Sequence, residues 1–237
     1  MDTQSFLTRF RADLRKNSDA KTRESSRRYF KEAAVFYGVR SSHLSLLNHT
    51  YFKEISSLPK AEIFMLCEEL FKSDISEEAF IAADWAYKVH RFYTVDDWNT
   101  FEHWVKNYIN NWAKCDSLCN HAIGTLLDMY PSLMPRLKSW TSSNNRWVKR
   151  ASAVTLIVPA RQGKFLSDIF EIADILLLDP DDMVQKGYGW MLKEASKAHQ
   201  NEVYEYVINH KATMPRTALR YAIEKMPPDL RAQAMKK

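Results

Sequence analysis

Trp190 is a large aromatic residue at a position where a surface helix more often carries a charge. The segment 182–197 has apolar and small residues at helical spacing, and they form one stripe: Val184, Gly187, Tyr188, Met191, Leu192 and Ala195. At about 100° per residue, Trp190 lies away from this stripe, on the same side as Lys186 and Lys193. An indole between two lysines suits a flat, negatively charged partner such as nucleic acid. The alternative is that a neighbouring element of the protein covers the ring.

Trp112 and Asp116 are two further residues that could do chemistry, and they lie one helical turn apart. A carboxylate stabilises a developing positive charge, and the face of an indole attracts a cation. Two alternatives stay open. Asp116 could form a surface ion pair with Lys114 or Arg150. Trp112 could pack between helices.

Metal or cofactor chemistry has no support in the sequence. Cys115 and Cys119 lie one turn apart but have no matched pair of histidines, so they make a poor zinc site. Buried, small apolar side chains are the simpler interpretation of both. The chain has three cysteines in all, which predicts no disulfide framework. We therefore expect neither a metal nor a cofactor.

The elements that must position these residues are helices arranged in pairs. Helical periodicity runs through the chain, as in the stripe Ile63, Leu66, Cys67, Leu70 and Phe71. Only five glycines are present, which argues against a sheet with many tight turns. The helix pairs repeat at intervals of about 32–37 residues, and they begin near Ala61, Val95, Ser132, Phe165 and Gln200. Such pairs cannot bury their faces alone, so we predict an all-α fold, an α-solenoid of stacked antiparallel HEAT-like helix pairs.

We expect this solenoid to be one continuous domain over residues 1–237. Residues 1–60 would form an N-terminal helical cap, residues 61–231 about five helix-pair repeats, and residues 232–237 a polar tail. Ser76, and either Asp181 or Asp182, are predicted to cap the N-termini of helices.

Basic residues recur on the second helices of the predicted pairs. Second helices usually line one side of a solenoid, most often the concave one. The cations expected there are Arg146, Lys149, Arg150, Lys186, Lys193, Arg216 and Arg220. As a set they predict a groove that follows nucleic-acid phosphates, although any single lysine is more simply a solvated surface charge.

Residues 155–164, TLIVPARQGK, contain a short β-like patch, a proline, a glycine, Arg161 and Lys164. They could project as a short hairpin or basic finger, because a β-ribbon fits the major groove of DNA. The alternative is an ordinary loop between repeats.

Charge and hydropathy limit the class of protein. A net charge of +5 permits binding to nucleic acid without establishing it. Residues 1–17 carry charges inside their apolar run, unlike a signal peptide, and no apolar run approaches the roughly 20 residues that span a bilayer. We expect a cytoplasmic protein with no membrane partner, and a monomer, the default state of a short solenoid.

Four segments, in this order along the chain, resemble the AlkD-like DNA alkylation repair proteins, which are DNA glycosylases with HEAT-like repeats. The first is RRYFKEAAVFYGV, in which Tyr29 is similar to the family's N-terminal tyrosine near the lesion. The others are NNWAKCDSL with Trp112 and Asp116, NNRWVKRASA with Arg150, and VQKGYGWMLKEASK with Trp190.

The resemblance implies a concave basic surface that holds duplex DNA and excision of purines made cationic by N3- or N7-alkylation. It implies that Trp112 and Trp190 pack against the sugar of the damaged nucleotide, that Asp116 faces the anomeric carbon, and that Arg150 grips backbone phosphate. The alternatives are that Arg150 only ties neighbouring repeats together and that Tyr29 is a core residue. It also implies that the damaged base is not drawn into a tight pocket, unlike in most enzymes that act on a base.

The chemistry of these residues agrees with that expectation. Glycoside cleavage usually needs two carboxylates, one of them to protonate the leaving group, and the predicted groove offers only Asp116. One carboxylate suffices if the base is already cationic, because its departure then needs no proton. What remains is an oxocarbenium ion to stabilise and a water to orient. Neutral lesions such as uracil should not react.

One residue departs from the family pattern, and two other functions stay open. Asn111 stands before Trp112, where the resemblance implies an aromatic or apolar residue. The first alternative is a non-catalytic repeat protein that binds bent or branched DNA. The second is a protein–protein scaffold, although a scaffold would more often show an apolar or acidic concave face.

Overall fold

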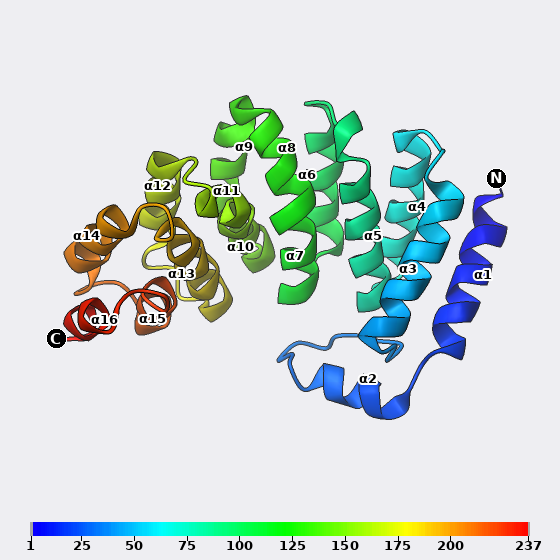
Figure 1. The fold of residues 1–237 in the computed structure, drawn as a ribbon, viewed down its shortest axis with the longest axis horizontal. Helices are drawn as coiled ribbons and strands as arrows, with labels where there is room; N and C mark the ends of the chain where they lie inside the picture. Colours follow the sequence, from blue (N-terminus) through cyan, green and yellow to red (C-terminus); the bar gives the residue numbers. More distant parts are fainter. Residues whose placement is uncertain (1, 237) are drawn as a thin grey trace. The chain divides into compact units, whose positions relative to one another are not determined.

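In the computed structural model, which describes residues 2–236, the chain is built from helices (Figure 1). The described residues form no β-strand, only two isolated bridges, Ser18 with Val39 and Val35 with Ile75. The predicted fold class, an all-α solenoid of stacked helix pairs, is confirmed. Contacts divide the chain into two compact units, Met1–Tyr93 and Thr94–Lys237. The expectation of one continuous domain stays a prediction.

The first unit contains the N-terminal helices and one helix pair. Its elements are α1 (Thr3–Lys16), α2 (Ala20–Arg27), α3 (Ser41–Ile55), α4 (Lys60–Lys72), α5 (Ser76–Lys88) and the 3₁₀ turn η1 (His90–Phe92). Helices α4 and α5 pack against each other, and α3 contacts both α1 and α5. The predicted stripe from Ile63 to Phe71 is fully buried in this unit.

The start of α5 corrects a sequence prediction. Ile75 occupies the N-cap position, so Ser76 is the first helical residue and not the cap. The backbone N–H of Ser76 donates to the carbonyl of Val35 at 2.9 Å, and this pairing replaces a side-chain cap. The buried carboxylate of Glu77 accepts the backbone N–H groups of Tyr37, Gly38 and Val39 and so holds the extended segment 35–39 against α5.

The second unit contains the remaining helix pairs. Its first elements are α6 (Asp97–Tyr108), α7 (Trp112–Leu118), the π-helical turn η2 (Cys119–Ile123), α8 (Gly124–Met129), η3 (Pro131–Leu133), α9 (Met134–Ser139), η4 (Trp140–Ser142) and α10 (Arg146–Val154). They are followed by α11 (Ile157–Arg161), α12 (Leu166–Leu176), α13 (Asp182–Ala195), α14 (Gln200–His210), α15 (Arg216–Ala222) and α16 (Pro228–Met235). The pairs begin within about two residues of the predicted positions.

Helix α13 lies at the centre of the packing in this unit, because it contacts α10, α11, α12, α14 and α15. Its predicted apolar stripe, from Val184 to Ala195, is buried. The side chain of Asp181 caps the helix by accepting the N–H groups of Met183 at 2.8 Å and Val184 at 3.2 Å, as the sequence predicted.

Residues 155–164 form neither a hairpin nor a projecting finger. They include the short helix α11, which contacts α8 and α13. Leu156, Ile157 and Ala160 are buried, so the patch that looked β-like is core and holds the segment inside the unit. Gly163, with φ +78°, then turns the chain toward α12.

The three cysteines are free and buried, as expected of small apolar side chains. Among residues 2–236, no three histidine, cysteine or carboxylate side chains lie together as metal ligands. Within the same residues no helix is long and apolar enough to cross a membrane.

Candidate functional site

The candidate site lies in the second unit and is built on α7, α10 and α13. Helix α7 carries Trp112 in its first position and Asp116 one turn later. Asn111 is its N-cap, buried, and its side-chain oxygen accepts the backbone N–H of Lys114 at 3.0 Å. An aromatic residue could not make this bond, so the departure from the family pattern at Asn111 has a structural reason.

Asp116 and Arg150 form a bidentate ion pair between α7 and α10. Arg150 Nε donates to Asp116 Oδ1, and Arg150 Nη2 donates to Asp116 Oδ2, both at 2.9 Å. Nη1 of Arg150 donates to the carbonyl of Met183, in the first turn of α13, at 2.6 Å. One guanidinium therefore ties three helices together and fixes the plane of the Asp116 carboxylate.

Gly187 gives the stem of Arg150 its space. A Cβ atom at this position would lie 3.3 Å from Arg150 Cγ and 3.7 Å from Nη1. The glycine in the middle of α13 therefore belongs to the surroundings of the ion pair, and not only to the apolar stripe in which the sequence placed it.

Burial shapes the electrostatics of this pair. Desolvation raises the pKa of the Asp116 carboxyl above its ordinary value, and the Arg150 guanidinium opposes that rise. Desolvation by itself would lower the pKa of Arg150, but the charge and hydrogen bonds of Asp116 outweigh it and raise that pKa. The side chain of Asp116 keeps 14% of its surface exposed, against 5% for Arg150, so a solvent-side approach is open only to the carboxylate.

The role that the resemblance implied for Arg150, a grip on DNA phosphate, stays a prediction. In the structure the guanidinium is buried, and three of its N–H groups donate to Asp116 and Met183. In this structure Arg150 is the partner of Asp116, which is the alternative that the sequence left open.

Trp190 is half-buried on α13, one turn beyond Gly187. Its indole N–H donates to Oε1 of Glu194 at 3.2 Å, and the Nζ atom of Lys193 lies 5.9 Å from the ring centroid. Sequence reasoning missed Glu194. The available signal in the sequence was a glutamate one helical turn after the tryptophan. In the structure this glutamate is only 4% exposed.

The other predicted cations of this unit are mostly engaged by carboxylates. Arg146 pairs with Asp181 and Asp182, Lys149 with Asp179, Arg161 with Glu194, Lys164 with Asp128, Lys186 with Asp182, and Lys193 with Glu224. Arg216 donates to the carbonyl of Met235, and Arg220 is exposed. Partly exposed pairs contribute about 0–1 kcal/mol each, so incoming phosphates could displace these carboxylates.

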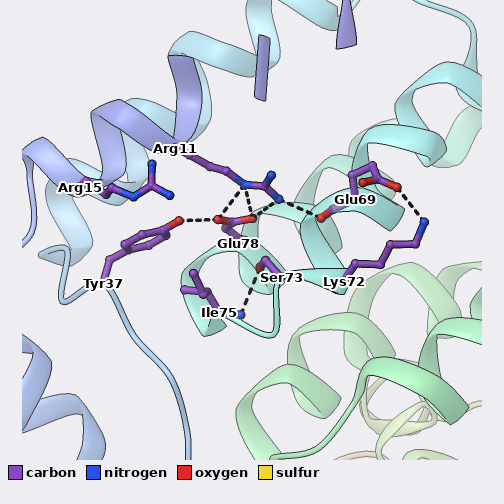
Figure 2. A pocket seen from close by; sticks show the side chains of 8 residues that line it. All are labelled: Arg11, Arg15, Tyr37, Glu69, Lys72, Ser73, Ile75 and Glu78. Atoms are coloured by element: carbon purple, nitrogen blue, oxygen red, sulfur yellow. Dashed lines mark hydrogen bonds and ion pairs between the residues drawn. The ribbon is translucent and has the colours of Figure 1, made fainter. Parts of the chain in front are cut away.

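Tyr29 lies in the first unit, near the end of α2, and is 74% exposed. The same unit has a shallow polar hollow of about 350 Å³, shown in Figure 2. Its centre is the buried carboxylate of Glu78, which accepts hydrogen bonds from Arg11 and from the Tyr37 hydroxyl. These bonds join α1 and the 35–39 segment to α5. None of the predicted site residues lines the hollow.

Comparison with known proteins adds family information to this geometry. The family model described as DNA alkylation repair enzyme matches residues 10–226. A search of curated proteins finds no match. Among solved structures, the fold is similar to that of a predicted DNA alkylation repair enzyme from Enterococcus faecalis, with a TM-score of 0.79 and 17% identity over 90% of this chain and 98% of that chain. Because the family model spans most of the sequence, the chain belongs to the DNA alkylation repair enzyme family, and this membership supports a role in the repair of alkylated DNA.

Proposed function

We propose that this protein is a DNA glycosylase that hydrolyses the N-glycosidic bond of N3- and N7-alkylated purines in duplex DNA. The observation that carries the proposal is the Asp116 carboxylate, held by two 2.9 Å bonds from a buried arginine yet still partly open to solvent. A carboxylate fixed in this way needs no reorganisation when positive charge develops beside it.

The substrate class follows from having one carboxylate and no separate acid. When the C1′–N bond of an alkylated purine breaks, the electron pair leaves with the base and neutralises its charge. The sugar becomes an oxocarbenium ion, water adds its oxygen to C1′, and the proton of that water passes to solvent. Asp116 stabilises the oxocarbenium ion electrostatically, and no group has to protonate the leaving base.

Trp112 and Trp190 supply the second part of the mechanism. Both indoles are half-buried, so each keeps surface for a partner. An indole packed against the sugar of the damaged nucleotide would stabilise the positive charge that develops there by about 0.5–2 kcal/mol when water is excluded. Two rings, at about 1–4 kcal/mol together, would therefore accelerate release by roughly one to three orders of magnitude, since each 1.36 kcal/mol is about tenfold.

The partner in this proposal is double-stranded DNA, bound by a monomer in the cytoplasm. Tyr29 is proposed to contact the DNA near the lesion, and Arg150 is proposed to fix Asp116. The proposed contacts to phosphate are Arg146, Lys149, Arg161, Lys164, Lys186, Lys193, Arg216 and Arg220. Phosphates would replace the exposed carboxylates that now pair with most of these side chains, whereas the buried Glu194 keeps Arg161 and Lys197 as its partners.

A second candidate function is a non-catalytic protein that binds bent or branched DNA. One observation favours it: both oxygens of Asp116 already accept hydrogen bonds from Arg150, as in a purely structural ion pair. A projecting basic finger no longer supports it, because residues 155–164 pack inside the second unit.

The experiment that tests the proposal is identification of the bases released by the protein. Methylated duplex DNA is incubated with the protein, and free 7-methylguanine and 3-methyladenine are quantified; a duplex containing uracil is the matched neutral substrate. We expect release of both cationic bases and no uracil. Tight, salt-sensitive binding without any release would favour the second candidate.

A further inference from the structure

Glu194 is a buried carboxylate that faces the indole of Trp190. It lies one turn after Trp190 on α13, and its Oε1 accepts the indole N–H at 3.2 Å. Its Oε2 accepts Nε of Arg161 at 2.7 Å and Nζ of Lys197 at 2.6 Å. Three donors from two segments therefore fix the position of this carboxylate.

The charge of Glu194 is maintained at neutral pH. Burial alone would raise the pKa of this carboxyl, but the hydrogen bonds from Lys197, Arg161 and Trp190 outweigh burial and leave the pKa below its ordinary value. The indole N–H thus donates to a full negative charge, which strengthens the bond relative to one with a neutral acceptor.

The hydrogen bond has two consequences for the ring. It fixes the rotation of the indole about its side-chain bonds, because the N–H edge must meet Oε1. It also polarises the indole toward higher electron density, which strengthens the attraction of its face for cations. Lys193, 5.9 Å from the ring centroid, is a cation already near this ring.

We infer that Glu194 is a positioning residue, which sets the orientation and the electron density of the Trp190 indole where it meets the cationic nucleotide. This inference rests on the proposed function, in which Trp190 packs against the damaged nucleotide. Glu194 acts through Trp190 and has no proposed contact with the substrate of its own.

The competing explanation is a structural tie, since Glu194 also joins α13 to Arg161 of α11. The two explanations differ in what happens without Trp190. A positioning residue has no further effect once the indole N–H is absent, whereas a structural tie has the same effect in both backgrounds.

The experiment is a double-mutant cycle with single-turnover release of 7-methylguanine as the readout. It compares the wild type with Glu194→Ala, Trp190→Phe and the double variant. Glu171→Gln is the control, because Glu171 is an exposed glutamate of the same unit, paired with Lys138. We expect Glu194→Ala to slow release about tenfold, equivalent to about 1.4 kcal/mol in the barrier. In the Trp190→Phe background, the same change should slow release less than about twofold.

A structural readout accompanies the rates. The tryptophans are replaced by 5-fluorotryptophan, and the Trp190 resonance is identified by its absence from Trp190→Phe. In Glu194→Ala this resonance should move or broaden, while Glu171→Gln leaves it in place. The fold should survive, because the side chains of Arg161 and Lys197 are 52% and 41% exposed and can turn to solvent. If Glu194→Ala does not fold, Glu194→Gln, which keeps an oxygen acceptor without the charge, takes its place in the cycle and is expected to slow release about threefold.

The outcomes separate this inference from the proposed function. An equal loss of rate in both backgrounds, or an unchanged Trp190 resonance, overturns the role of Glu194 while the glycosylase proposal stands. If the wild type releases no base, the glycosylase proposal fails. In that case the role of Glu194 is tested by DNA binding. Adding duplex DNA to the wild type should shift the Trp190 resonance. A smaller shift in Glu194→Ala supports the inference, and an equal shift in Glu194→Ala overturns it.

Discussion

Replacing Arg150 by Met should destabilise the protein in a pH-dependent way. Met keeps an apolar stem of similar length and removes all three hydrogen bonds, two to Asp116 and one to the carbonyl of Met183. At neutral pH the change leaves the Asp116 carboxylate desolvated without its partner. Removing one partner of a buried ion pair typically costs about 3–5 kcal/mol, and we expect a loss near the lower end because Asp116 retains some exposure.

The pH dependence follows from the pKa of Asp116. Burial raises this pKa in the folded protein and Arg150 opposes the rise, so without Arg150 the pKa rises further. Between the unfolded and folded pKa values the folded state then binds more protons than the unfolded state, and the stability of the variant falls as pH increases through this window. Below the ordinary aspartate pKa of 3.8 both states are protonated, and the charge-dependent part of the loss is absent.

The assay is urea unfolding followed by tryptophan fluorescence at several pH values from 4.5 to 8. The control is Arg136→Met, because Arg136 pairs with Glu102 at 2.9 Å but its side chain is 42% exposed, so its loss should cost no more than about 1 kcal/mol. The expected result is a stability gap between the wild type and Arg150→Met that widens toward pH 8. A gap that does not depend on pH, or one as small as that of the control, would show that Arg150 does not hold a buried negative charge on Asp116.

Three further predictions concern the second unit. Gly189→Ala should destabilise the protein by about 2 kcal/mol in thermal unfolding. The new Cβ would lie 2.7 Å from Tyr221 Cβ and 2.8 Å from the carbonyl oxygen of Ala218, and this overpacking outweighs a helix-propensity gain of about 1 kcal/mol. A stabilised variant would contradict the prediction. Base release, corrected for the reaction without enzyme, should fall as pH decreases through the pKa of Asp116, with a midpoint above 3.8, because only the carboxylate stabilises the oxocarbenium ion; a flat profile down to pH 4 would remove Asp116 from the rate-determining step. Arg220→Ala should reduce the log–log salt dependence of duplex binding by about 0.9, the contribution of one phosphate contact; an unchanged slope would show that Arg220 touches no phosphate.

The helices and their pairing were predictable because they depend on local periodicity. The stripes on α4 and α13 are buried as expected, since residues three and four apart share a helix face wherever the helix packs. The cap of α5 was not predictable, because the group that satisfies its first N–H is the carbonyl of Val35, some forty positions earlier in the chain.

The candidate site was predictable in its residues and less so in their roles. Asp116 and Trp190 were identified from spacing and from resemblance, but most of the cations have partners about thirty residues or more away in sequence, as with Lys149 and Asp179. A basic groove was therefore predicted where the structure has mostly ion pairs. Arg150 looked like a surface cation because sequence alone cannot reveal that a turn of α13 with a glycine covers it.

The central claim, that Asp116 stabilises positive charge on the sugar, is tested most directly by Asp116→Asn. Single-turnover release of 7-methylguanine and 3-methyladenine is compared for the wild type, Asp116→Asn and the control Asp128→Asn, which removes an exposed carboxylate paired with Lys164. Duplex affinity and thermal stability are measured on the same samples. We predict that Asp116→Asn binds duplex DNA but releases at least about a hundredfold less base, while Asp128→Asn releases base as the wild type does. Wild-type release by a folded Asp116→Asn would contradict this claim.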